Sequence, residues 1–160
     1  MSEENQAAEN QPVFAIQKIY VKDVSVESPN APQAFLEQLQ PEFNIQFRNE
    51  ARGFDNGFYE VSLTVTAQAQ VEDRTVFLIE ATQAGLFQIE HVPAEEMDPL
   101  LGIGAPSILF PYLRETVSDL TTRAGFPPLL LQPINFEAIY LQQRAQQAAQ
   151  QQAGTTETTH

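Results

Sequence analysis

The chain has 160 residues, of which 42% are hydrophobic, a length and composition that suit one domain with one core. Its 8 Lys and Arg residues against 21 Asp and Glu give a formal net charge of -13, which opposes binding to nucleic acids and anionic lipid surfaces and favours basic partners. Because Cys is absent, the composition excludes disulfides and thiolate metal sites.

Both ends of the chain are polar. Residues 1–11 are rich in Glu, Asn and Gln, and residues 145–160 are rich in Gln and Thr. Both segments are predicted to be disordered, which leaves an ordered domain over residues 12–144. The first residues lack the basic-then-apolar pattern of a signal peptide, and no apolar run approaches the roughly 20 residues that cross a bilayer. We therefore expect a cytoplasmic protein.

The first half of the chain has the period-2 patterns of strands. A long strand is predicted from Val13 to about Glu27, and the three prolines of residues 28–41 indicate a crossover loop that carries Phe35 and Leu39. Second, third and fourth strands follow, over residues 43–48, 59–69 and 75–89, with turns at residues 53–57 and 72–74. Gly85 is interpreted as a bulge in the fourth strand. Four consecutive strands indicate an antiparallel sheet.

The second half changes to a helical period. Leu109, Leu113, Val117 and Leu120 share one face of an amphipathic helix. Pro106 suits its first turn, whereas Pro111 is expected either to kink the helix or to mark its beginning. Gly125 ends this helix, and the prolines of residues 126–134 predict an extended apolar loop. Asn135 then caps a last helix that fades over residues 142–152.

The sequence contains no recognisable set of catalytic or metal-ligating residues. Gly102-Ile103-Gly104 lacks the Gly-Lys-Ser/Thr end of a phosphate-binding loop. His91 lies near no local nucleophile signature, and Glu95-Glu96 is interpreted as a solvated acidic face. We therefore expect no enzymatic activity, no cofactor and no metal. An enzyme that uses His91 with Glu95 or Glu96 is the least favoured alternative.

Three segments carry more specific motifs. They are Ile19-Tyr20-Val21-Lys22-Asp23-Val24-Ser25 with Glu27 and Pro29-Asn30-Ala31-Pro32, then Gly104 through Glu115, and finally Phe126-Pro127-Pro128-Leu129 through Pro133-Ile134-Asn135-Phe136. Together they resemble the SecB protein-export chaperone family from about Phe14 to Leu141. The resemblance implies an α+β fold with a four-stranded antiparallel sheet, a long crossover loop and two main helices on one side, assembled as a homotetramer from two dimers.

The resemblance also implies a function. Members of this family are ATP-independent holdases that bind unfolded secretory precursor proteins in the cytoplasm and deliver them to the SecA motor ATPase for translocation. The charge, the apolar loops and the lack of a catalytic set are compatible with such a role. Two alternatives remain open at this point: a SecB-like chaperone of a toxin-antitoxin system, and a carrier of small apolar ligands.

The family's binding residues map onto two sets of positions. The SecA-binding positions are implied at Asp23, Glu27, Leu78 and Glu80, and parity places Asp23 with Glu27 and Leu78 with Glu80 on shared strand faces. Without the resemblance, exposed strand carboxylates would be the preferred interpretation. The client-binding positions are implied at Phe35, Phe43, Ile45, Phe47, Phe126, Leu129, Phe136 and Tyr140. Alternation alone predicts core burial for Phe43, Ile45 and Phe47, so the loop residues are the better candidates.

Overall fold

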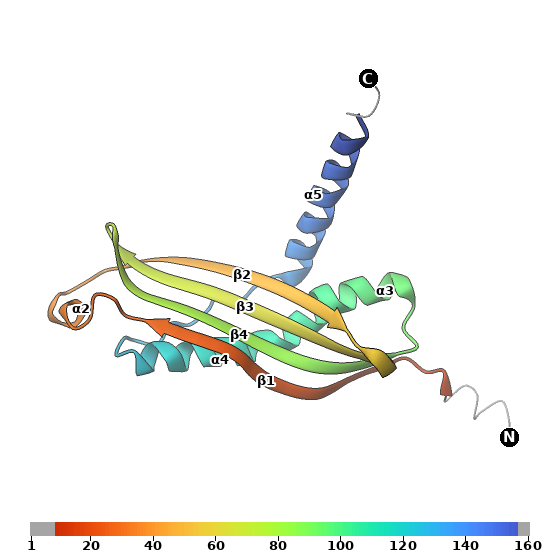
Figure 1. Cartoon of the computed structure of the whole chain (residues 1–160), viewed down its shortest axis with the longest axis horizontal. Coiled ribbons are helices and arrows are strands. Elements are labelled where there is room, and N and C mark those ends of the chain that lie inside the picture. Colours follow the sequence, from red (N-terminus) through yellow and green to blue (C-terminus); the bar gives the residue numbers. More distant parts are fainter. Residues whose placement is uncertain (1–8, 157–160) are drawn as a thin grey trace.

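The computed structural model describes residues 9–156 and contains one four-stranded sheet (Figure 1). The strands are β1 (Val13–Glu27), β2 (Glu42–Gly53), β3 (Phe58–Val71) and β4 (Arg74–Glu90), in the order β1-β4-β3-β2. Every neighbouring pair is antiparallel. The four predicted strands and the antiparallel sheet are therefore confirmed. β1 and β2 are the two edge strands.

The helices follow the sheet, apart from the one-turn α2 (Gln33–Leu36) in the crossover between β1 and β2. The short α3 (Ala94–Pro99), the π-helical turn η2 (Leu100–Gly104) and α4 (Ala105–Arg123) run in succession. A 3-10 turn, η1 (Asp55–Gly57), links β2 to β3. Figure 1 shows α4 lying across one face of the sheet and α5 (Phe136–Thr156) projecting away from it. Among the described residues, no helix combines the length and apolarity needed to cross a membrane.

The core lies between α4 and the sheet. Leu109, Leu113 and Val117 are fully buried, as the helical period predicts, and pack with Val61, Val65 and Phe87 of the sheet. Pro106 occupies the first turn of α4, whereas Pro111 lies inside the helix on its exposed side. No helix of the described residues covers the opposite face of the sheet, and we call it the open face (Figure 1).

Gly85 is not a bulge, contrary to the sequence interpretation. It pairs in register with Val61 and Ile19. A Cβ at this position would lie 2.7 Å from the ring of Phe87 and 3.1 Å from the side chain of Leu109. Gly85 is therefore required by close packing rather than by irregular pairing. The irregularities of β1 lie instead between Ile16 and Lys18 and between Val21 and Asp23.

The end of the chain also differs from expectation. α5 continues to Thr156, whereas disorder was predicted from residue 145. The reason is local: residues 145–153 are Ala and Gln, which favour helix, and the first helix-weakening residue is Gly154. The predicted N-terminal cap is confirmed, because the amide of Ala138 donates to Oδ1 of Asn135 at 3.0 Å. The predicted disorder of residues 1–8 and 157–160 lies outside the described residues.

Candidate binding surfaces

The four implied SecA-binding positions form one patch on the open face. Glu27 pairs with Leu78, and Ser25, which lies between Asp23 and Glu27 on this face, pairs with Glu80. Asp23 pairs with Thr82, whose hydroxyl lies 2.8 Å from that of Thr64 on β3. We call Asp23, Glu27, Leu78 and Glu80 the acidic patch.

The acidic patch is accessible. Its three carboxylates are exposed and Leu78 is half-buried. Within residues 9–156, no ion pair involves Asp23, Glu27 or Glu80. An uncompensated cluster of three negative charges around one apolar side chain suits a basic partner with an apolar contact.

Next to the patch, Glu60 of β3 forms hydrogen bonds with two side chains of β1. Its carboxylate accepts a 2.6 Å hydrogen bond from Nζ of Lys22 and a short one from the Tyr20 hydroxyl. The bond from Lys22, followed by that from Tyr20, lowers the pKa of Glu60. Burial, followed by the hydrogen bond and the charge of Glu60, raises the pKa of Tyr20 to about 12. At neutral pH the cluster therefore holds an ionised carboxylate and a neutral phenol.

An apolar cavity of about 480 Å³ lies on the other side of the sheet, at the end that carries the crossover. It brings together four of the implied client-binding residues from three separate segments: Phe35, Phe43, Phe126 and Leu129. The remaining lining residues are Ala34, Glu37, Leu39, Pro41, Val76, Phe77, Gly125, Pro127 and Pro128. We call this cavity the apolar groove.

Four aromatic rings, each tilted against the next, line the apolar groove. The ring centroids of Phe35 and Phe126 are 5.1 Å apart, those of Phe126 and Phe77 are 5.0 Å apart, and those of Phe77 and Phe43 are 6.2 Å apart. Phe35 and Phe43 are about half-exposed, whereas Phe77 is buried. The groove thus offers adaptable apolar surface with aromatic edges and faces.

Two hydrogen bonds to α4 hold the loop that carries Phe126 and Leu129. The amide of Leu129 donates to the hydroxyl of Thr121 at 2.9 Å, and Nε of Arg114 donates to the carbonyl of Leu131 at 2.8 Å. At the start of the loop, Gly125 has a φ of +90°, and a Cβ there would lie 3.0 Å from the ring of Phe35. Gly125 thus allows both the turn and the close approach of the crossover segment.

Three other implied client-binding residues lie outside the apolar groove. Ile45 and Phe47 are half-buried and pack against the main core, and Phe136 is buried. The ring of Phe110 joins two of them, with centroids 6.1 Å from Phe47 and 5.9 Å from Phe136. Alternation predicted this burial for Ile45 and Phe47. Phe136 is buried because the first turn of α5 faces the core.

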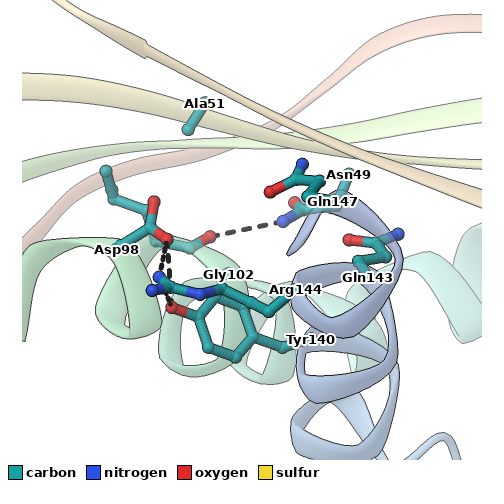
Figure 2. Close-up of a pocket in the computed structure, with 9 residues that line it drawn as sticks. Asn49, Ala51, Asp98, Gly102, Tyr140, Gln143, Arg144 and Gln147 are labelled. Atoms are coloured by element: carbon teal, nitrogen blue, oxygen red, sulfur yellow. Dashed lines mark hydrogen bonds and ion pairs between the residues drawn. The ribbon is translucent and has the colours of Figure 1, made fainter. Parts of the chain in front are cut away.

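Tyr140, the eighth implied position, lines a polar pocket of about 250 Å³ between β2, α3, η2 and α5 (Figure 2). Its hydroxyl donates to Oδ2 of Asp98 at 3.0 Å, and Arg144 donates to the same oxygen and to the hydroxyl, both at 2.9 Å. A Cβ on Gly102 would lie 2.8 Å from the ring of Tyr140. Tyr140 therefore serves to dock α5 against η2.

Sequence reasoning missed Phe77 and the Tyr20–Glu60–Lys22 cluster. Phe77 has the parity of the buried residues Ile79 and Ala81, so alternation could have placed it on the helix side, but only the fold brings Phe126 against it. Glu60 had no local signal because its partners lie about 40 residues away. No three His, Cys, Asp or Glu side chains of the described residues cluster as a metal site.

Comparisons with known proteins show the family of the chain. The family model described as preprotein translocase subunit SecB matches residues 7–147. The curated "Protein-export protein SecB" of Chromobacterium violaceum is 61% identical over 140 residues, which is 88% of this chain and 93% of the relative. The protein of the same name from Thiobacillus denitrificans is 57% identical over 148 residues, or 92% of this chain and 96% of the relative.

One solved structure resembles the fold at lower identity. It is a SecB-like chaperone of Mycobacterium tuberculosis in complex with a peptide from an antitoxin. The TM-score is 0.62 and the identity 22%, over 81% of this chain and 91% of the other. At that identity the likeness concerns the fold alone.

Proposed function

The chain belongs to the SecB family of protein-export chaperones, and from this premise we propose that it binds unfolded secretory precursors in its apolar groove and delivers them to SecA through its acidic patch. It does so in the cytoplasm, without ATP and as a homotetramer. The relatives that carry the export name are 53% to 61% identical, far above the 22% of the antitoxin-linked chaperone. Export is therefore favoured over the toxin-antitoxin role and over a small-ligand carrier.

The apolar groove is the single observation that supports client binding most directly. Burial of apolar surface is non-directional, so a groove lined mainly by aromatic and aliphatic side chains accepts many sequences. Phe35 and Phe43 expose about half of their surface without a ligand, which leaves apolar area to bury when a client segment enters. Among the described residues, Glu37 is the only charged side chain in the lining.

The acidic patch supports delivery to a basic surface of SecA. Its three carboxylates are exposed and form no ion pairs with the other described residues, so a partner's Lys or Arg side chains need not displace a cation of residues 9–156. Leu78 lies directly opposite Glu27 and offers an apolar contact within the charged patch. Charge complementarity of this kind speeds encounter and sets the orientation of the two partners.

Exposed apolar side chains support self-assembly. β1 pairs with β4 on one side only, and five of its apolar side chains are between 36% and 49% exposed: Phe14, Ile16, Val21, Val24 and Val26. Tyr112 of α4 and Leu130 of the following loop are also exposed. An edge strand and a helix surface provide the two kinds of interface that a dimer of dimers requires.

Mass measurement tests the proposal as a whole. Native mass spectrometry of the full chain should give a tetramer, a complex with a slow-folding unfolded precursor, and a ternary complex after SecA is added. The chaperone should also suppress aggregation of that precursor, and Phe126→Asp should remove the suppression while the tetramer persists. A monomer, or undiminished suppression by Phe126→Asp, would contradict it.

Charge reversal tests the docking step separately. The triple variant Asp23→Lys, Glu27→Lys and Glu80→Lys should abolish SecA binding, because the patch would then repel a basic surface. Client affinity should be unchanged, since none of the three residues lines the apolar groove. Titration calorimetry with SecA and with an unfolded precursor measures both. Unchanged SecA affinity would refute the docking assignment.

A further inference from the structure

β1 contains an extra residue beside the acidic patch. In its register with β4, Tyr20 pairs with Ala84 and Val21 with Gln83, but Thr82 pairs with Asp23. Lys22 is therefore inserted as a β-bulge. Gln83 lies on the helix side, where its side chain accepts a 3.1 Å hydrogen bond from Thr116 of α4. Thr82 points to the open face and contacts Thr64.

The bulge decides which face of the sheet carries the acids. Side chains alternate along a strand, so one inserted residue moves every later side chain to the opposite face. Without the bulge, Asp23 and Glu27 would point toward α4, and Val24 and Val26 would point to the open face. With it, Val24 and Val26 pair with the buried residues Ala81 and Ile79, and the carboxylates join Glu80.

Glu60 holds the bulge in place through hydrogen bonds to β1. It lies on β3, so its carboxylate reaches across β4 to the inserted Lys22 at 2.6 Å and to Tyr20, two residues earlier. The Glu60 side chain is only 16% exposed, whereas that of Lys22 is 49% exposed. A shielded carboxylate that accepts two charge-assisted hydrogen bonds holds its partners more firmly than an exposed ion pair does.

We propose that Glu60 is a positioning residue for partner docking: it anchors Lys22, the inserted residue of the bulge, and Tyr20, two residues before it, and so keeps Asp23 and Glu27 on the open face. In this role Glu60 does not touch the docking partner itself; it acts by holding the acidic patch in position. This role rests on the proposed docking of SecA at the acidic patch. The lowered pKa of Glu60 supports it, because the carboxylate stays ionised throughout the physiological range.

Three single variants of the full-length chaperone test the proposal. Glu60→Gln weakens both hydrogen bonds, and Lys22→Gln removes one donor from an exposed position and so should leave folding intact. Glu50→Gln is the matched control. Glu50 lines a pocket on the open face together with Glu60 and Lys22. Its ion pair, at 3.3 Å, is however with Arg48 of its own strand. The control therefore removes the same charge from the same face without touching β1.

SecA affinity should fall by about fivefold to tenfold in Glu60→Gln and by about threefold in Lys22→Gln, the scale of lost charge-assisted hydrogen bonds. Glu50→Gln should bind SecA about as well as the parent, because Glu50 lies outside the acidic patch and has no contact with β1. Hydrogen exchange of residues 20–27 should quicken only in the first two variants. Client affinity, measured with an unfolded precursor, should be unchanged in all three.

The outcomes separate this proposal from the proposed function. If the triple Lys variant still binds SecA, the docking site itself is wrong. If that variant fails to bind but Glu60→Gln and Lys22→Gln both retain parental affinity, only the positioning role is overturned. Equal losses in Glu60→Gln and Glu50→Gln would also overturn it, because charge alone would then explain the effect. Should Glu60→Gln fail to assemble, the Lys22→Gln result decides.

Discussion

The open face and the apolar groove are built in opposite ways. The acidic patch consists of residues on two paired strands, so the register of β1 with β4 fixes the spacing of its charges. The apolar groove joins the crossover segment, one end of β2 and β4, and the loop after α4, which meet only in the folded chain. Paired strands give a fixed charge pattern, whereas converging loops give an adaptable apolar surface.

The two surfaces nevertheless share one strand. Phe77 and Leu78 are consecutive residues of β4 and point to opposite sides of the sheet. Phe77 is one of the two inner rings in the row of four that lines the groove, and Leu78 lies within the acidic patch opposite Glu27. The proposed client-binding and docking surfaces thus lie back to back, separated by the thickness of one sheet. Variants at the two positions show whether the surfaces act independently.

The largest effect is expected from Phe77→Ala. Phe77 is only 3% exposed and contacts both Phe43 and Phe126, so its truncation should cost about 3–5 kcal/mol of unfolding free energy. Client affinity should fall while SecA affinity is retained. Leu78→Ala is the matched control and should show the reverse pattern with a small stability loss. Denaturant unfolding and calorimetry measure these quantities, and parallel losses in both variants would show that the two surfaces are coupled.

Gly125→Ala should lower the free energy of unfolding by about 2 kcal/mol, because an L-residue at a φ of +90° is strained. The new Cβ would also push the ring of Phe35, 3.0 Å away, and so widen the gap between the crossover segment and the loop. Weaker client binding and a lower unfolding midpoint are expected. Gly53→Ala, in a strand with its nearest contact at 3.3 Å, is the control. Equal effects of the two variants would argue against a special role for Gly125.

The sequence predicted the parts of the molecule that rest on local patterns. Alternation identified four strands, helical spacing identified the buried face of α4, and parity grouped Asp23 with Glu27. It could not identify the bulge at Lys22. β1 has apolar residues on both faces, so one inserted residue leaves no visible break in the period-2 pattern. It also could not separate groove from core: Phe43 and Phe47 have the same parity, but only Phe43 lies where the two loops converge.

Thr121 offers a finer test of the groove wall. Its buried hydroxyl accepts the amide hydrogen of Leu129 at 2.9 Å and is in reach of the carbonyls of Val117 and Ser118. Thr121→Val is nearly isosteric but leaves that amide unsatisfied, which should cost about 1 kcal/mol and weaken client binding. Thr121→Ser keeps the hydroxyl and should keep client affinity. If both variants bind clients equally, the hydrogen bond does not position the loop.

The smallest effect concerns the open face, where burial and the neighbouring Glu60 raise the pKa of Tyr20 to about 12. Because the folded-state value is raised above 10.0, the stability it contributes is complete below pH 10 and is lost as pH rises toward 12. Phenolate absorbance in an alkaline titration follows this group. Glu60→Gln should lower the pKa of Tyr20, since it removes the adjacent charge and weakens the hydrogen bond. Glu50→Gln should leave it unchanged, and an unshifted titration in Glu60→Gln would show that Glu60 does not anchor Tyr20 in solution.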